Sequence, residues 1–339
     1  MNTISNNNKQ FDIPIVLFTF KRYKTVLRIL KRIEPLRPQK LYIISDGPRT
    51  EEEKIEIDKA RKIIEEGITW NCEIIRDYAE ENVGIYNRIG LGAKWVLSKE
   101  EHAIFLEDDN LPEETFFPFC KEMLERYKND SRVLWICGTN YLEKYQPQDG
   151  SSYVFTKHLL PCGWASWKGK FESYYDGELQ LLTDKDIVKR VKDEYTNVSL
   201  YHQQINSAST ELYRKEKNQR FSSWDFQMAF SIRAHNVLGI SPCYNQIKNI
   251  GVDNLSTHGG TSFSNIMTRR FCGIESFPLA FPLKHPKTVL TDLEYEKKVD
   301  KIILFPKRIR IKSTIARFIK RICGINKYEK FKSKSTELR

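Results

Sequence analysis

The sequence predicts an α/β fold with a mostly parallel central sheet flanked by helices, and two observations support this prediction. Short apolar runs such as residues 13–20 (IPIVLFTF) are typical of strands buried on both faces. These runs alternate with amphipathic segments of helical period, as in sheets whose parallel strands are joined by helices. With 339 residues, 40% of them hydrophobic and 29% charged, the chain can bury a full core.

The predicted elements follow one another along the chain. Acidic residues in the first turn of residues 50–67 suit the helix dipole, and Gly67 is a suitable stop for that helix. Strands are expected at residues 13–20, 40–47, 72–77, 103–109 and 130–142, and helices at 23–33, 50–67 and, after a turn, within 82–100. Later, residues 180–220 are expected to be helical and to form a lid, and residues 237–251 to form a strand pair.

Cysteine usage and hydropathy limit the possible classes of protein. The seven cysteines are odd in number and never spaced as C-x-x-C, which argues against a disulfide framework or a thiolate zinc site. No apolar run approaches the ~20 residues that cross a bilayer, and the N-terminal sequence lacks the pattern of a secretion signal. We therefore expect a protein of the reducing cytosol.

Three adjacent acids end the predicted strand at 103–109, namely Glu107, Asp108 and Asp109. Parallel strands present ligand sites at their carboxyl ends, and Asp46 ends another predicted strand in the same way. Carboxylates suit Mg²⁺ or Mn²⁺, which is often held by one or two carboxylates together with substrate phosphates. The alternative is a solvated acidic turn that begins the next helix.

The order of the motifs resembles that of a GT-A fold glycosyltransferase, with a Rossmann-like nucleotide-sugar-binding core. It is most similar to the N-acetylglucosaminyltransferase I type and to related bacterial surface-polysaccharide enzymes. The resemblance covers roughly residues 12–260. It rests on VLFTFKR, LYIISDG, NVGIYNRIGLGAKWVL, FLEDDNLPEETFF, LLPCGWASW, FSSWDFQMAF and GISPCYNQIKNIGVDNLSTHGG.

The resemblance implies roles in binding the donor. Asp109 would bind the metal as in a DXD motif, Asp108 the ribose hydroxyls, and Glu107 the ribose or sugar. Arg22 and Asp46 match positions that recognise the base, and an Asp suits the ring N–H of uracil, so a UDP-sugar is favoured. Asp46 is equally well explained as a turn residue before Gly47.

Further residues match the donor and acceptor sites of the family. Arg88 would face the diphosphate or else be a surface cation. His258 matches a late second metal ligand. Trp164 would stack on an acceptor sugar, although a core position is the alternative.

Asp225 in the SSWDFQ segment matches the catalytic base of an inverting transfer. The family has a second acid at the next position, where this chain has Phe226. The alternative for Asp225 is a helix cap, a role that Ser223 would also suit.

The net charge of +11 comes from the end of the chain. Residues 301–339 hold 13 Lys/Arg and two Glu, and the other 300 residues hold 42 basic and 42 acidic side chains. Ile311, Ile315, Phe318, Ile319 and Ile322 fall on one helical stripe beside basic residues, a pattern that suits an anionic membrane surface. The alternative is packing on the catalytic domain. Nucleic acid is not expected as a partner.

These observations predict a domain layout and a function. Residues 1–10 would be loose, residues 11–285 a catalytic domain with a nucleotide-sugar-binding half (11–145) and an acceptor-binding half (146–285), and residues 286–339 a basic tail. The expected activity is a metal-dependent inverting hexosyl transfer from a nucleotide-sugar to a saccharide or lipid-linked saccharide of bacterial surface polysaccharide or lipopolysaccharide. It would take place on the cytoplasmic face of the membrane. The alternatives are a sugar nucleotidyltransferase and a non-catalytic membrane- or nucleic-acid-binding protein.

Overall fold

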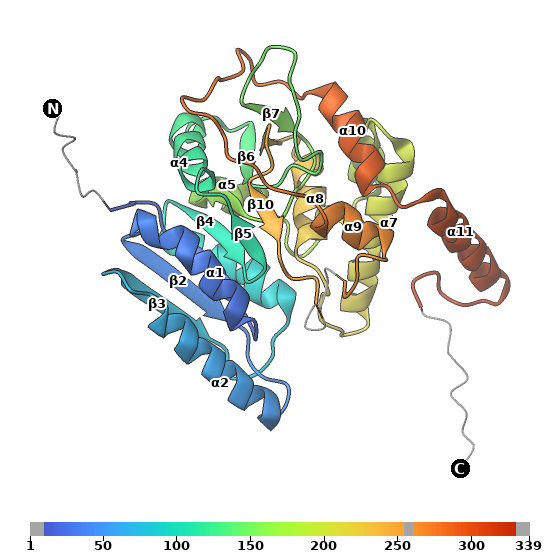
Figure 1. Ribbon diagram of the computed structural model, residues 1–339. Helices are drawn as coiled ribbons and strands as arrows, with labels where there is room; N and C mark the ends of the chain where they lie inside the picture. Colours follow the sequence, from blue (N-terminus) through green and yellow to red (C-terminus); the bar gives the residue numbers. More distant parts are fainter. Residues whose placement is uncertain (1–9, 254–259, 330–339) are drawn as a thin grey trace.

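A computed structural model of the chain describes residues 10–253 and 260–329. Its centre is a mixed eight-stranded sheet in the order β3-β2-β1-β4-β8-β6-β9-β7, flanked by helices (Figure 1). Strands β3, β2, β1 and β4 run parallel to one another, as predicted. Beyond β4 the sheet departs from the prediction, because β8 is antiparallel to both β4 and β6.

The first half of the sheet forms where the sequence predicts it. Its strands are β1 (Ile15–Thr19), β2 (Lys40–Ser45), β3 (Glu73–Tyr78) and β4 (His102–Glu107). Every residue of β1 is buried, as expected for an apolar strand covered on both faces. The second half consists of β6 (Val133–Cys137), β7 (Tyr153–Thr156), β8 (Trp164–Trp167) and β9 (Leu238–Pro242).

Two hydrophobic layers cover the faces of the sheet. One face packs against α1 (Tyr23–Ile33), α2 (Glu51–Glu66) and α4 (Phe116–Tyr127). The other packs against α3 (Gly92–Lys99), α5 (Lys168–Tyr174) and α8 (Asp225–Ala234). A π-helical turn, Tyr86–Leu91, leads directly into α3. A third, smaller apolar cluster includes α6 (Lys185–Val191) and α7 (Val198–Glu216).

A small two-stranded sheet lies beside the end of β4. Strand β5 (Asn110–Pro112) pairs antiparallel with β10 (Ile247–Asn249). The predicted strand pair in residues 237–251 is therefore two strands, β9 and β10, that pair with other partners. This pairing brings the chain after β10 next to the three acids that precede β5.

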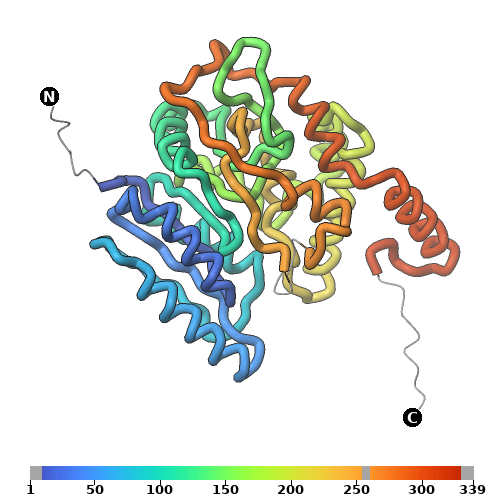
Figure 2. Tube along the Cα trace, in the orientation of Figure 1, coloured from blue at the N-terminus to red at the C-terminus, as the bar shows by residue number. Residues whose placement is uncertain are grey.

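The packed domain extends further toward the C-terminus than the sequence predicts. Residues 273–292 run from α9 (Ile266–Cys272) past α4 to α10 (Leu293–Ile303), without helix or sheet strand (Figure 2). In α10, Tyr295 and Val299 are fully buried, so this helix belongs to the packed domain and not to a tail beginning at residue 286. In contrast to α10, α11 (Lys307–Ile322) has no buried residue. Within the described residues, no helix meets the length and apolarity needed to cross a membrane.

Candidate active site

The carboxyl ends of β1 and β4 lie side by side and form the centre of the candidate site. In the parallel register of these strands, Phe18 is opposite Glu107. The chain that continues from each strand therefore meets the other, and the backbone N–H of Phe20 donates to Oδ2 of Asp108 at 3.3 Å. This is where an open parallel sheet is expected to bind a ligand.

Arg22 lies among the acids at this junction. Its Nη1 atom is 3.3 Å from Oδ2 of Asp109 and 3.6 Å from Oδ1 of Asp108. Its Nη2 atom donates to the carbonyl of Gly251 at 3.0 Å and to Oδ1 of Asp253 at 3.2 Å. With 9% of its side chain exposed, Arg22 is a nearly buried counter-charge for the acidic cluster.

Asn110 fixes the turn that carries the acids. Its amide nitrogen donates to Oδ1 of Asp109 at 2.6 Å, and its carbonyl oxygen accepts from the backbone N–H of Gly163 at 2.8 Å. The backbone N–H of Ile250 donates to the carbonyl of Asp109 at 2.9 Å. The acidic turn is therefore held from both sides, by the loop before β8 and by the end of β10.

Burial raises the pKa values of all three acids, and repulsion from neighbouring carboxylates adds to this effect at Glu107 and Asp108. For Glu107 the burial of the carboxyl raises the pKa well above its usual range, and Asp109, Asp108 and Asp225 raise it further. For Asp108, burial and the charge of Asp109 raise the pKa to about 7. The pKa of Asp109 is also raised by burial, but Arg22, Asn249 and Asn110 oppose this effect. One guanidinium does not balance this much negative charge, so the cluster favours a further cation.

Asp225 approaches the same cluster from α8. It is the first residue of that helix, and its charge acts on Glu107. The hydroxyl of Ser223 donates to Oδ1 of Asp225, and the Ser223 oxygen in turn accepts from the backbone N–H of Phe226 at 3.1 Å. Ser223 thus binds the first turn of the helix and orients the Asp225 carboxylate, whose charge raises the pKa of Glu107.

Asp46 has a structural role in this protein. Its Oδ1 accepts from the backbone N–H groups of Gly47 and Val83, at 2.8 and 2.9 Å. Its Oδ2 accepts from the side chain of Asn82 at 2.9 Å and from the N–H of Gly84 at 3.1 Å. These four hydrogen bonds tie the loop after β3 to the end of β2, which matches the turn alternative and leaves the carboxylate occupied by protein donors.

Arg88 is also engaged by the protein. Its Nη1 atom lies 3.2 Å from Oδ2 of Asp77, and Nη2 donates to the Asp77 carbonyl, so the side chain holds the π-helical turn against the end of β3. Only 13% of the side chain is exposed. The contacts of Arg88 are therefore with β3 and not with the acidic cluster.

Trp164 corrects the prediction of a sugar-stacking aromatic. Its ring is 1% exposed and lies between Phe105 and Trp135, with ring centroids at 3.9 and 4.0 Å. Both faces of the indole are therefore covered by other aromatic rings. Trp167 is 5% exposed and belongs to the core as well. The sequence did not distinguish these core positions from an acceptor site. A tryptophan that points from a strand into the core and a tryptophan that lines a binding site have the same local sequence pattern.

Gly251 and Asp253 are site residues that the sequence analysis missed. They reach Arg22 only because β10 pairs with β5, a long-range contact with no local signature. The predicted metal ligand His258 lies outside the described residues.

Solved structures similar to this chain include a mannosyltransferase from Pyrobaculum calidifontis in complex with GDP-Man and Mn²⁺ (11% identity, TM-score 0.37, covering 67% of this chain and 70% of that one). Mouse xyloside xylosyltransferase 1 is 10% identical (TM-score 0.39, covering 67% and 83%). The 4-diphosphocytidyl-2C-methyl-D-erythritol synthase from Anaerococcus prevotii is 13% identical (TM-score 0.32, covering 52% and 77%).

None of these three structures is of the N-acetylglucosaminyltransferase I type that the motif order resembles. No protein-family model matches the chain, and a search of curated proteins by sequence finds no match. With TM-scores below 0.5, the structural similarities carry no argument about activity, which is argued below from the site itself.

The residues of the cluster are compatible with a hard divalent cation, although they do not form a complete set of ligands. Within residues 10–253 and 260–329, no group of three or more His, Cys, Asp or Glu side chains is arranged to hold a metal by itself. A cation here would rely on one or two carboxylates and on oxygen atoms of a ligand, which is the usual arrangement for Mg²⁺ with phosphates. It would also share Asp109 with Arg22.

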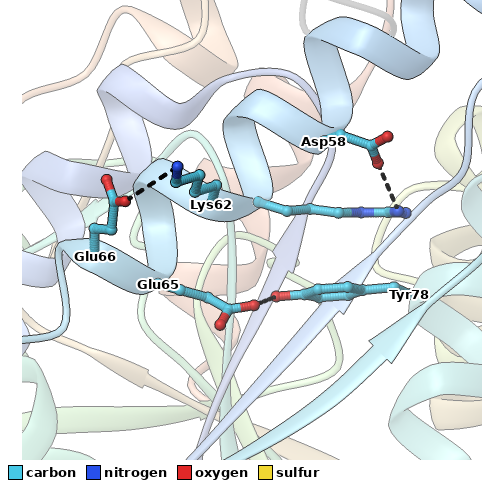
Figure 3. Close-up of a pocket in the computed structure, with 6 residues that line it drawn as sticks. Asp58, Lys62, Glu65, Glu66 and Tyr78 are labelled. Atoms are coloured by element: carbon cyan, nitrogen blue, oxygen red, sulfur yellow. Dashed lines mark hydrogen bonds and ion pairs between the residues drawn. The ribbon is translucent and has the colours of Figure 1, made fainter.

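A separate pocket on α2 and β3 lacks the features of a site (Figure 3). Its charged and polar side chains pair with one another, as in the hydrogen bond of 2.7 Å from the Tyr78 hydroxyl to Glu65 and the contact of 3.6 Å between Arg61 and Asp58. It contains none of the candidate residues. The junction of β1 and β4 therefore remains the candidate site.

Proposed function

We propose that the protein is a metal-dependent, inverting glycosyltransferase that uses a nucleotide-diphosphate sugar. The single observation that carries the proposal is the cluster of Glu107, Asp108 and Asp109 at the carboxyl end of β4. It is largely but not fully buried, with 16% of the Asp108 side chain and 17% of the Asp109 side chain exposed, its pKa values are raised, and Arg22 contacts it. An acidic cluster of this kind is costly to the folded state unless a cation binds to it.

In this proposal, Asp109 and Asp108 would hold a divalent cation together with the donor diphosphate. The cation would neutralise charge that develops on the departing nucleotide diphosphate. Arg22, fixed by Asp109 and the Gly251 carbonyl, is the protein's own positive charge at the same place. Glu107, whose carboxylate has no hydrogen bond to a side chain in the described part of the chain, is free to accept from hydroxyls of the ribose or sugar.

Asp225 is the proposed base. Its carboxylate would take the proton of an acceptor hydroxyl as that oxygen bonds to the anomeric carbon and the bond to the diphosphate breaks. The displacement inverts the anomeric configuration. The effect of the Asp225 charge on Glu107 supports this role, and the hydroxyl of Ser223 orients the carboxylate.

The finer assignments come from the resemblance and remain part of the proposal. They are a UDP-sugar as the donor, a hexosyl group as the transferred unit, and a saccharide or lipid-linked saccharide of surface polysaccharide as the acceptor. The cytoplasmic face of a membrane is the proposed place of reaction. Asp46 and Arg88 are left out of this scheme, because protein groups already occupy them.

Thermal unfolding of the whole protein with nucleotide diphosphates tests the donor site. UDP and GDP are each added with and without Mn²⁺, to wild type, to Asp109→Asn and to the exposed control Asp58→Asn. A ligand at 100 times its dissociation constant should add ~2.7 kcal/mol to the free energy of unfolding. We expect metal-dependent stabilisation by one diphosphate in wild type and in the control, and its loss in Asp109→Asn.

A turnover screen over UDP-, GDP- and dTDP-sugars then tests the chemistry. Release of the nucleoside diphosphate is expected with a glycosyltransferase. Formation of a nucleotide-sugar from a nucleoside triphosphate and a sugar phosphate would instead establish a nucleotidyltransferase. Failure of every nucleotide to bind with metal would overturn the proposal.

A further inference from the structure

Helix α11 exposes a continuous apolar stripe. Its side chains are exposed by 49% at Ile311, 54% at Ile315, 64% at Phe318 and 70% at Ile322. At 100° per residue these positions and Ile319 fall within an arc of about 100° on one side of the helix. In Figure 1, α11 stands beside the body of the protein, beyond α7 and α10. The apolar face of this helix is therefore not covered by the described part of the chain.

The rest of the helix surface is basic. Within Lys307–Ile322 there are seven Lys/Arg residues and no acid. Lys312 lies just beyond one edge of the stripe, and Arg317 and Arg321 lie beyond the other. An amphipathic helix with cationic borders matches the interface of an anionic bilayer, where the apolar side chains enter the acyl boundary and the cations meet the head groups.

The domain holds both ends of this helix. At its start, Arg270 of α9 donates to the carbonyls of Ile302 and Leu304 at 3.1 and 3.0 Å, and the Gln203 side chain accepts from the N–H of Phe305 at 2.8 Å. At its end, Gly324 with φ +66° turns the chain back. The hydroxyl of Tyr213 in α7 then donates to Glu329 at 2.9 Å. The chain on both sides of α11 is thus held by the domain, which fixes the position of the exposed apolar stripe.

We propose that α11 docks the protein on an anionic lipid surface, lying flat with the Ile311–Ile322 stripe in the interface. The inference gives a docking surface for the membrane location that is part of the proposed function, and it does not depend on the enzymatic activity. A second copy of the chain is a poorer occupant, because two such helices bring 14 like charges together with no acid to offset them. A nucleic acid would meet the basic residues but leave the apolar stripe in water.

Flotation of the full chain with vesicles tests the proposal. Binding is expected to vesicles rich in phosphatidylglycerol and not to pure phosphatidylcholine. The double variant Ile315→Ser with Phe318→Ser keeps all charges and should lose binding by at least tenfold. Its matched control is Ile55→Ser with Leu290→Ser, which removes two apolar side chains that are exposed by 74% and 70% elsewhere.

A charge variant separates the two contributions. Lys312→Gln with Arg317→Gln should weaken binding about 30-fold, since each cation near an anionic surface contributes about fivefold. Its control, Lys59→Gln with Lys62→Gln on α2, should bind as wild type. Because no residue of α11 is buried, the melting temperature should be unchanged in every α11 variant.

Cys323, the exposed cysteine at the end of α11, offers a second readout. A polarity-sensitive dye on this thiol should shift to the blue with phosphatidylglycerol vesicles. Three results would overturn the proposal. They are no binding to any vesicle, binding that survives Ile315→Ser with Phe318→Ser, and a wild-type dimer that this variant turns into a monomer without any lipid effect.

Discussion

The Nη1 atom of Arg22 lies 3.3 Å from Oδ2 of Asp109, although 87 residues separate the two along the chain. The parallel pairing of β1 with β4 brings them together, and both side chains are largely buried. The site is therefore assembled by the sheet and not by a single motif. Within the described residues, the permanent cation of this site is Arg22, and several carboxylates compete for it.

Replacing Arg22 by Leu should destabilise the protein by about 3 kcal/mol, because it leaves buried carboxylates without their partner. Mn²⁺ should restore part of the lost stability, since it supplies positive charge at the same place. Thermal unfolding with and without Mn²⁺ measures both effects. Arg28→Leu, at an exposed position on the same helix, is the control. An unchanged melting temperature in Arg22→Leu would show that the cluster does not depend on this guanidinium.

Gly251→Ala should disrupt the contact between Arg22 and Asp109. A Cβ atom at this position would lie 2.5 Å from Nη1 of Arg22 and 2.5 Å from Oδ2 of Asp109, closer than real contacts allow. We expect metal-dependent nucleotide binding to fall at least tenfold, with the fold retained. Calorimetric titration measures the affinity, and Gly169→Ala is the control because its Cβ would meet nothing within 4 Å. Equal affinities in the two variants would contradict the prediction.

Asp108→Asn should stabilise the metal-free protein at alkaline pH. The pKa of Asp108 is raised to about 7, so the folded protein binds more protons than the unfolded chain between about pH 4 and pH 7. The free energy of unfolding therefore falls as the pH rises through this window. The Asp108→Asn variant has no carboxyl group at this position and does not lose this stability. The gain should be near zero at pH 4 and up to about 4 kcal/mol above pH 7, because each of about three pH units is worth about 1.4 kcal/mol.

Chemical denaturation in EDTA across this pH range measures the gain. Glu66→Gln, at an exposed position of α2 (63% of the side chain), should show no such trend. A gain that is constant with pH would mean that the Asp108 carboxyl is not the group that titrates.

Local signals account for the parts of the fold that the sequence predicts well. Helix α2 begins after Thr50, whose hydroxyl accepts from the N–H of Glu53 at 3.3 Å, and ends at Gly67. The apolar runs of β1 and β2 determine their burial directly. The three acids were found because adjacent carboxylates repel one another, and a chain that leaves a buried strand has little structural reason to gather them there.

The rest of the site depends on long-range pairing, which no local pattern encodes. The antiparallel insertion of β8 between β4 and β6 turns Trp164 into the core, and the pairing of β10 with β5 brings Gly251 and Asp253 to Arg22. Asp46 shows a different difficulty. Its position at the end of a strand suits a ligand site. The groups that donate hydrogen bonds to its carboxylate lie in residues 82–84, and the sequence does not show that this loop lies beside Asp46.

Trp164→Leu should destabilise the protein by about 3 kcal/mol and leave the KM for the acceptor unchanged. The indole is stacked between Phe105 and Trp135, so its loss opens a cavity in the core. Phe226→Leu, at a ring that is 36% exposed, should have a much smaller effect on stability. Thermal unfolding and initial rates test the two statements separately. A raised KM for the acceptor with an unchanged melting temperature would contradict this prediction and indicate that Trp164 contacts the acceptor.

Asp225→Asn should lower kcat by a factor of about 10² to 10⁴, the usual contribution of a positioned general base. The affinity for the donor should be unchanged, because the cluster at the end of β4 is intact in this variant. Ser223→Ala should give a smaller loss, since it removes the hydroxyl that orients the carboxylate but keeps the base itself. Initial rates with donor-binding titrations separate these effects. Parallel losses of kcat and donor affinity in Asp225→Asn would instead place this carboxylate among the donor ligands, and the proton would then need another acceptor.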